Sequence, residues 1–149
     1  MLDLPDDLFP ALLIAQSAHE DQLDKAGQPY ILHPIRVAMR VSPYGSEAMV
    51  MGLLHDVLED SPYTAWDLLS AGISQEVVLG VRTLTHWEGL TRAEYEAHIL
   101  AAPEAVRRVK LADVLDNSDE RRPHKLSDSL ALRYYNLYRA LRESFGEDQ

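Results

Sequence analysis

The feature that most limits how this chain can fold is a set of metal-binding side chains embedded in apolar stretches. His33 lies in the stretch YILHP, His55 and Asp56 lie in LLHDVLED, and Asp113 lies in VKLAD. Burial of imidazoles and carboxylates is costly unless a metal ion or an opposite charge pairs with them. Two histidines and two aspartates suit a divalent ion such as Mn²⁺, Fe²⁺ or Zn²⁺, which can activate water at neutral pH. The pattern therefore predicts a metal-dependent hydrolase.

Length and composition restrict the ligands and the partners. The 149 residues suffice to bury most of the apolar surface, so we expect residues 1–149 to form a single domain. Without cysteine, every metal ligand must come from His, Asp, Glu or the backbone. The net charge of −10 argues against a nucleic-acid polymer as partner, because binding one relies on Lys and Arg to neutralise phosphates. A small phosphorylated substrate remains compatible, since a bound cation can offset the repulsion locally.

The start of the chain bears on where the protein works. The segment MLDLPDD carries acids where a signal peptide would need basic residues, and no apolar run approaches the length of a membrane span. We therefore expect a cytoplasmic protein with no membrane partner. Nothing in the sequence indicates an oligomeric state.

Helix signals predict an all-α fold, a single-domain helical bundle. Helix starts are indicated at residues 5–7, 34, 46–47, 64–67, 91–94, 103–104 and 127, whereas strand-type alternation is almost absent. The apolar face of the first helix is expected to run through Leu8, Leu12, Ala15, His19 and Leu23. The helix expected over residues 46–58 is apolar on nearly all sides, which predicts a central buried helix. The helix from Ser127 ends near Phe145.

Spacing along the expected helices places the acids near the histidines. On one helix, His55 with Glu59, and Asp56 with Asp60, are four residues apart, so each pair shares a face. His55 and Asp56 are about 100° apart around the helix axis, so both reach one ion only from the flank between them.

A second polar stripe lies on the helix that carries Asp113. Lys110, Asp113 and Asn117 recur at helical spacing in a segment otherwise expected in the core. We interpret Lys110 as a snorkelling surface lysine and leave it outside the site. Asn117 fits two roles equally well, helix termination or substrate contact.

Four ordered segments resemble a known family. They are AHEDQ at 18–22, AGQPYILHP at 26–34, LHDVLED at 54–60 and VKLAD at 109–113. In these segments the chain resembles the HD-domain metal-dependent phosphohydrolases. Specifically, it looks like a small stand-alone relative of the hydrolase domain of RelA/SpoT-type (p)ppGpp enzymes. The resemblance implies a helical bundle of the HD-domain type.

The resemblance also implies roles for particular residues. One divalent metal ion, usually manganese in that family, with Fe²⁺, Co²⁺ or Zn²⁺ as alternatives, would be bound by His33, His55, Asp56 and Asp113. The attacking water would be oriented or deprotonated by Glu59 and Asp60, and the substrate would be contacted by Lys25 and Asn117. The implied reaction is hydrolysis of a phosphoester of a small nucleotide, releasing pyrophosphate from the ribose 3′ position of a (p)ppGpp-like alarmone.

This chain departs from the family pattern mainly at substrate positions. The departures are Asp24 for the arginine expected to stack on guanine, Ala26 for a serine, Asp116 for a histidine, and Ser118-Asp119-Glu120 for Met-Arg-Thr. We expect the added acids to disfavour a tetra-anionic guanosine unless Arg121, Arg122 or Lys125 turns inward.

Two alternative functions follow from the same residues. The first keeps the metal chemistry in a 2′- or 3′-nucleotide phosphatase, including one acting on NADPH, and is favoured by Asp24 and Glu120. The second is a non-catalytic helical module that binds a metal for stability or senses a ligand. The adjacent acids Glu59 and Asp60 speak against the second, because a structural site does not need them.

The remaining histidines and aromatic residues are expected to have structural roles. His19 is expected to pack between helices or to hydrogen-bond the Gly27 turn. Surface positions are expected for His86, His98 and His124, and helix-packing positions for Trp66, Trp87 and the tyrosines of residues 134–138.

Overall fold

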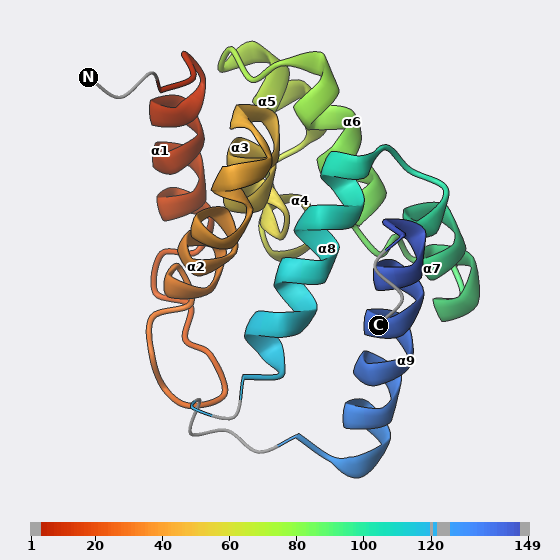
Figure 1. Cartoon of the computed structure of the whole chain (residues 1–149). Coiled ribbons are helices and arrows are strands. Elements are labelled where there is room, and N and C mark those ends of the chain that lie inside the picture. Colours follow the sequence, from red (N-terminus) through yellow and green to blue (C-terminus); the bar gives the residue numbers. More distant parts are fainter. Residues whose placement is uncertain (1–3, 120, 122–125, 147–149) are drawn as a thin grey trace.

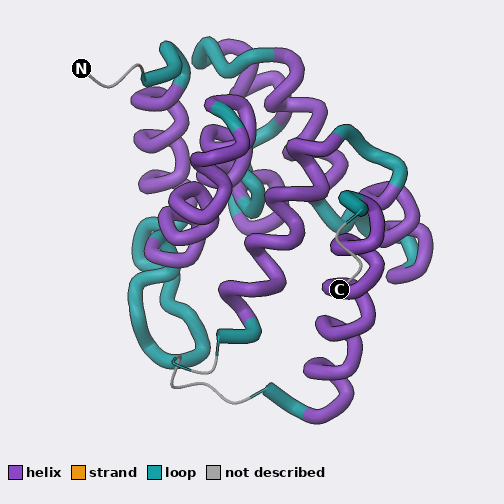
Figure 2. The backbone as a smooth tube through the Cα atoms, in the orientation of Figure 1, coloured by secondary structure: helices purple, strands orange, loops and turns teal. Residues whose placement is uncertain are grey.

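Helices make up the regular structure in the computed structural model, which describes residues 4–119, 121 and 126–146 (Figure 1). They are α1 (Leu8–Ala18), α2 (Leu32–Val41), the 3₁₀ helix η1 (Ser42–Tyr44), α3 (Ser46–Leu54), α4 (Val57–Asp60), α5 (Ala65–Ser70), α6 (Gln75–Leu84), α7 (Arg92–Leu100), α8 (Glu104–Asn117) and α9 (Asp128–Ser144). Across these described ranges the chain forms no strand, and an isolated bridge joins Leu23 to Pro29 (Figure 2). The predicted all-α fold class is confirmed.

Helix α3 lies at the centre of the bundle, as its apolar sequence predicted. It packs against α1, α2, α6 and α8 (Figure 1). Within α3 the side chains of Val50, Met51 and Leu54 are buried. Gly52 allows α2 to approach closely, because a Cβ atom there would lie 3.1 Å from backbone atoms of Ala38. The α2–α3 contact therefore depends on a residue without a side chain.

The predicted continuous helix over residues 46–58 is wrong, because it breaks at the His-Asp pair. Helix α3 ends at Leu54 and α4 begins at Val57, with His55 and Asp56 between them. Carbonyl groups in the last turn of a helix lack intrahelical partners. The carbonyl oxygen of Gly52, in the last turn of α3, accepts a hydrogen bond from the His55 ring at 2.7 Å. The expectation that His55 and Asp56 point about 100° apart on one helix therefore does not apply.

The apolar face predicted for the first helix is only partly correct. Ala15 and His19 are buried, but Leu12 is 39% exposed and Leu23 lies outside α1 and is 61% exposed. The helix ends at Ala18, and the chain then turns through Asp21, which has a left-handed φ of 63°. The helical spacing therefore does not continue to Leu23.

The two tryptophans are not packing residues, contrary to expectation. Trp66 is 74% exposed because the short helix α5 buries only Leu68, and Trp87 is 46% exposed in the loop before α7. Among the tyrosines, Tyr134 and Tyr138 pack against the core, whereas Tyr135 is 55% exposed.

Capping side chains begin three of the later helices where the sequence predicted them. Thr64 and Thr91 each form a capping box, with Asp67 and Glu94 respectively, and Ser127 accepts from the backbone of α9. Such caps satisfy N–H groups that have no intrahelical partner.

Among the described residues, no helix combines the length and the apolarity needed to cross a bilayer.

Candidate metal centre

Four side chains from three parts of the fold converge on one point. His33 comes from the first turn of α2, His55 and Asp56 from the break after α3, and Asp113 from α8. Nε2 of His33 lies 2.9 Å from Oδ1 of Asp113 and 3.7 Å from Oδ2 of Asp56. Nε2 of His55 lies 3.1 Å from the same Asp56 oxygen and 3.4 Å from the same Asp113 oxygen. The structure thus brings together all four predicted ligands.

The spacing of these atoms fits a single metal ion. Bonds of about 2.0–2.2 Å to nitrogen and oxygen ligands place neighbouring ligand atoms about 3.0–3.5 Å apart around one ion. Ligand atoms of His33, His55 and Asp56 all lie within 4.8 Å of one another, and Asp113 adds a fourth. Nε2 of His55 is buried without a hydrogen-bond partner. A cation at this point would satisfy that nitrogen.

Each histidine is held through its other ring nitrogen. Nδ1 of His55 lies 2.7 Å from the Gly52 carbonyl oxygen, and Nδ1 of His33 lies 2.7 Å from Oδ2 of Asp116. A carbonyl or carboxylate acceptor at Nδ1 favours the tautomer with the hydrogen there. Both Nε2 lone pairs can then point to the centre.

The electrostatic field at the centre favours positive charge. Burial by itself lowers the pKa of His55, but Asp56 and Asp113 raise it well above its ordinary value. Burial likewise raises the pKa of Asp113, yet Lys110 and the two histidines hold it well below its ordinary value. The carboxylates of Asp56 and Asp113, which favour a positive charge on His55, would in the same way attract a divalent cation.

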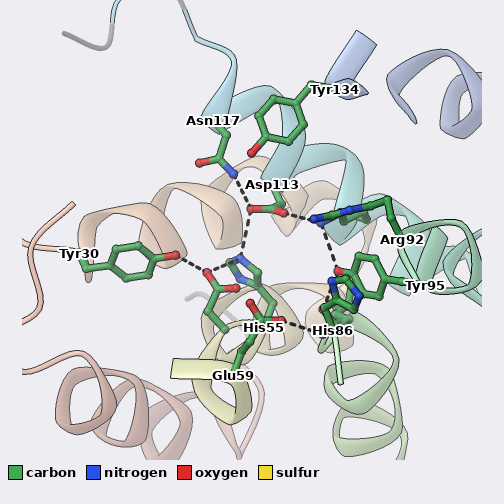
Figure 3. A pocket seen from close by; sticks show the side chains of 12 residues that line it. Tyr30, His55, Glu59, His86, Arg92, Tyr95, Asp113, Asn117 and Tyr134 are labelled. Atoms are coloured by element: carbon green, nitrogen blue, oxygen red, sulfur yellow. Dashed lines mark hydrogen bonds and ion pairs between the residues drawn. The ribbon is translucent and has the colours of Figure 1, made fainter. Parts of the chain in front are cut away.

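A cavity of about 200 Å³ adjoins the centre (Figure 3). Its lining includes three of the predicted ligands, His55, Asp56 and Asp113, together with Glu59. The backbone N–H of His86 donates to Oε1 of Glu59 at 2.7 Å, and burial nevertheless raises the pKa of that carboxyl. A carboxylate with a raised pKa beside a metal site is suited to accept a proton.

The two adjacent acids of α4 occupy different surroundings. Glu59 lines the cavity, whereas Asp60 accepts a hydrogen bond from Nε2 of Gln22 at 3.2 Å. Gln22 in turn contacts Nδ1 of His19 at 2.8 Å. Burial also raises the pKa of Asp60. His19 is buried, as expected, but its partner is Gln22 rather than the Gly27 turn.

Lys110 and His86 are parts of the site that sequence reasoning placed on the surface. Nζ of Lys110 donates to Oδ2 of Asp113 at 3.0 Å and to the Tyr95 hydroxyl at 3.2 Å, and its side chain is 12% exposed. The His86 ring stacks on Tyr95 at a centroid distance of 4.7 Å and lines the cavity. For Lys110 the sequence did contain an indication, because its position one helical turn before Asp113 places the two side chains on the same face of the helix. We find none for His86.

A second cavity of about 250 Å³ connects the predicted substrate residues to the centre. It is lined by the exposed Lys25 and by Asn117, Tyr30 and Tyr134, the last three of which also line the first cavity. Asn117 ends α8 and donates to Oδ1 of Asp113 at 3.1 Å. Both of its predicted roles are therefore compatible with its position.

Two of the acids expected to repel a guanosine substrate are paired with arginines of α2. Asp116 is 1% exposed and bonded to His33 and Arg36, and the carboxylate of Asp119 pairs with Arg40 at 3.4 Å. Burial alone raises the pKa of Asp116, but the hydrogen bonds from His33 and Arg36 bring it to about 2.

Asp24, which stands where the family pattern has an arginine, also has a structural role. Oδ1 of Asp24 accepts from the backbone N–H groups of Ala26 and Gln28, which holds the turn before the second cavity. Arg121 is exposed and pairs with Asp119. Glu120, Arg122, His124 and Lys125 lie outside the described residues.

Comparisons with known proteins identify relatives with named activities. A guanosine-3′,5′-bis(diphosphate) 3′-pyrophosphohydrolase of Haemophilus influenzae is 39% identical over 117 residues, covering 70% of this chain and 17% of the relative. The bifunctional (p)ppGpp synthase/hydrolase SpoT of Escherichia coli is 36% identical over 129 residues, covering 76% of this chain and 18% of the relative. This chain thus spans less than a fifth of the length of these curated relatives. No protein-family model matches it.

The fold has a counterpart among solved structures. A metazoan ortholog of SpoT that hydrolyses ppGpp superposes with a TM-score of 0.78 and 22% sequence identity, over 97% of this chain and 88% of that one. Fold and site together define a helical domain of the HD type. The chain is a relative of the RelA/SpoT-type (p)ppGpp hydrolases, as the resemblance of its four segments predicted.

Proposed function

We propose that this protein is a metal-dependent phosphohydrolase that cleaves the 3′-pyrophosphate of a (p)ppGpp-like nucleotide. The observation that carries the proposal is the convergence of four ligand atoms from His33, His55, Asp56 and Asp113 beside a carboxylate-lined cavity. The relatives named as (p)ppGpp 3′-pyrophosphohydrolases support the choice of reaction. A cytoplasmic location, with no nucleic-acid or membrane partner, belongs to the same proposal.

The metal ion we propose is Mn²⁺, held by the four ligand side chains. Imidazole and carboxylate together suit Mn²⁺, Fe²⁺, Co²⁺ or Zn²⁺, so the ligand set alone does not select among them. When bound, such an ion supplies a water of lowered pKa and offsets negative charge on a phosphate. Tyr30 donates from its hydroxyl to Oδ2 of Asp56 at 2.6 Å, which orients that carboxylate.

Glu59 is the residue we assign to proton acceptance. It lines the cavity, its pKa is raised by burial, and the His86 N–H fixes one of its two oxygens. Its other oxygen is available to take a proton from the attacking water. Asp60, bonded to Gln22, is assigned to orienting that water from the side of α4.

Basic and polar groups face the same cavity and suit a phosphorylated substrate. Lys110 and Arg92 line it, and the Arg92 guanidinium lies 5.9 Å from the Tyr95 ring centre (Figure 3). The second cavity, with Lys25 and Tyr134, has room beside the first for the rest of a nucleotide. Asp116 is buried and paired with Arg36, so it is not presented to a substrate, whereas Asp24 lines the second cavity and still brings a carboxylate to it.

The experiment that tests the proposal is hydrolysis by the Mn²⁺-loaded protein of ppGpp, NADPH and simple 2′- and 3′-nucleotides, with pyrophosphate and orthophosphate measured separately. Pyrophosphate from ppGpp is the expected result. Orthophosphate from another nucleotide, with ppGpp intact, would establish the phosphatase alternative on the same metal site. An inactive protein that melts much lower without metal would favour the non-catalytic module.

A further inference from the structure

A buried carboxylate lies directly behind the proposed ligand His33. Asp116 is 1% exposed, and its Oδ2 lies 2.7 Å from Nδ1 of His33, the ring nitrogen that faces away from the centre. Asp116 follows Asp113 by three residues on α8, so one helix carries a ligand and the partner of another ligand. Such outer partners fix the orientation and tautomer of a metal-binding histidine.

Arg36 completes this arrangement from α2. Its Nε donates to Oδ1 of Asp116 at 2.8 Å and its Nη2 to Oδ2 at 3.1 Å. The planar fork of an arginine matches a carboxylate in this two-point geometry. The Arg36 side chain is 38% exposed, so it reaches solvent while Asp116 does not. Arg36 thereby fixes the buried carboxylate in the position from which it accepts from His33.

We propose that Asp116 is a positioning residue that holds the hydrogen of His33 on Nδ1 and directs its Nε2 lone pair at the metal, with Arg36 fixing Asp116. The inference rests on the proposed function, in which His33 is a ligand. His55 has only a neutral carbonyl acceptor, that of Gly52. A charged acceptor makes a histidine a more basic ligand, so His33 is the stronger donor of the two. The resemblance places a histidine at position 116, so Asp116 departs from that family pattern.

A purely structural role for the Asp116–Arg36 pair predicts different behaviour. The pair joins α8 to α2, and the Arg40–Asp119 pair, one helical turn further along α2, joins α2 to the residues just after α8. If Asp116 served only to join the helices, Asp116→Ala and Arg36→Met would both lower the stability of the metal-free protein and leave metal affinity unchanged. Arg40→Met is the matched control, because Arg40 forms this second link without contacting His33.

The test measures Mn²⁺ binding to the full chain by calorimetry, without any activity assay. Asp116→Ala is expected to weaken binding about 10–100-fold. Asp116→Asn keeps a neutral acceptor and is expected to lose less, while Arg40→Met stays at wild-type affinity. If the wild type binds Mn²⁺ and Asp116→Ala binds it equally well, the inference is overturned and the metal centre stands. If the wild type binds no Mn²⁺, the metal centre of the proposed function fails together with the inference.

A spectroscopic measurement on the wild type covers the case in which Asp116→Ala does not fold. In the Zn²⁺-loaded protein, ¹⁵N NMR of the imidazole rings is expected to show Nε2 of His33 bound to metal and Nδ1 carrying a hydrogen protected from exchange. The Nδ1 hydrogen of His55, bonded to a carbonyl, is the internal comparison. A His33 ring bound through Nδ1, or one whose Nδ1 hydrogen exchanges freely, would overturn the inference.

Discussion

His33 and Asp113 are 80 residues apart in the sequence, yet Nε2 of the first lies 2.9 Å from Oδ1 of the second. The contact exists because α2 packs against both α3 and α8 (Figure 1). Small changes in the spacing of these helices therefore alter the ligand geometry, and Gly52 lies at the α2–α3 contact, where a Cβ would meet the backbone of Ala38.

Gly52→Ala is expected to lower both stability and metal affinity. Its added Cβ would meet the backbone of Ala38 at 3.1 Å, so α2 must move by a few tenths of an ångström. Overpacking of this kind costs about 1–3 kcal/mol. Urea unfolding and Mn²⁺ calorimetry measure the two effects. Gly80→Ala is the comparison, since its Cβ meets the side chains of Met51 and Val106, which can adjust. Equal effects of the two substitutions would contradict the account.

Asp113→Ala is expected to abolish metal binding and to destabilise the metal-free protein. The substitution removes one ligand and leaves the Lys110 ammonium, which is 12% exposed, without its carboxylate. Breaking a buried ion pair in this way costs about 3–5 kcal/mol. Metal content and urea unfolding are the measurements. Asp119→Ala, which removes a carboxylate just beyond α8, should leave both properties near wild type.

Glu59→Gln should separate metal binding from catalysis. The amide keeps the shape of the side chain and its hydrogen bond from the His86 N–H, but it cannot accept a proton. Loss of a general base costs about 10²–10⁴-fold in rate. We therefore expect kcat to fall by that factor while Mn²⁺ affinity is retained. Full activity of Glu59→Gln would show that another group accepts the proton.

The pH dependence of kcat/KM should report the raised pKa of Glu59. Burial raises this pKa, and the hydrogen bond from His86 opposes the rise only in part. Because the base must be ionised, kcat/KM is expected to fall as pH decreases through a value above the ordinary pKa of glutamate. Folding stability changes with pH in the opposite direction. Glu59 binds its proton more tightly in the folded than in the unfolded protein, so the stability that this proton contributes is lost as pH rises from the ordinary pKa of glutamate to the raised one. An acid limb at the ordinary value would contradict the assignment.

The convergence of the four predicted ligands could be expected from sequence because their surroundings are so apolar. Carboxylates and imidazoles in stretches such as LLHDVLED must be paired when buried, and His55 and Asp113 are indeed within 3.4 Å of each other. Helix boundaries marked by capping residues, as at Thr91, were predictable for a similar reason, because the cap satisfies free N–H groups.

The break at the His-Asp pair was not predictable from periodicity. The apolar pattern of residues 46–58 continues through His55, so the sequence reads as one helix. The His55 ring instead takes the Gly52 carbonyl, and α3 ends at Leu54. This local competition between a side chain and the helical backbone leaves no mark in the apolar periodicity.

The prediction for Lys110 was wrong, whereas the effect of the acidic departures on a substrate stays a prediction. Asp116 and Asp24 were counted as repelling a phosphorylated substrate, but each accepts two or more hydrogen bonds within the protein. Lys110 was assigned to the surface, yet it pairs with Asp113. The partners of Asp116 come from α2 and depend on the fold, whereas these partners of Asp24 and Lys110 lie within four residues along the chain.

The most direct test of the central claim is a titration of metal-stripped protein with Mn²⁺ while pyrophosphate release from ppGpp is measured. We expect no turnover without metal, saturation at one Mn²⁺ per chain, and no recovery at any Mn²⁺ concentration in Asp56→Ala. Turnover that survives metal removal, or an active Asp56→Ala protein, would contradict a metal centre formed by these four side chains.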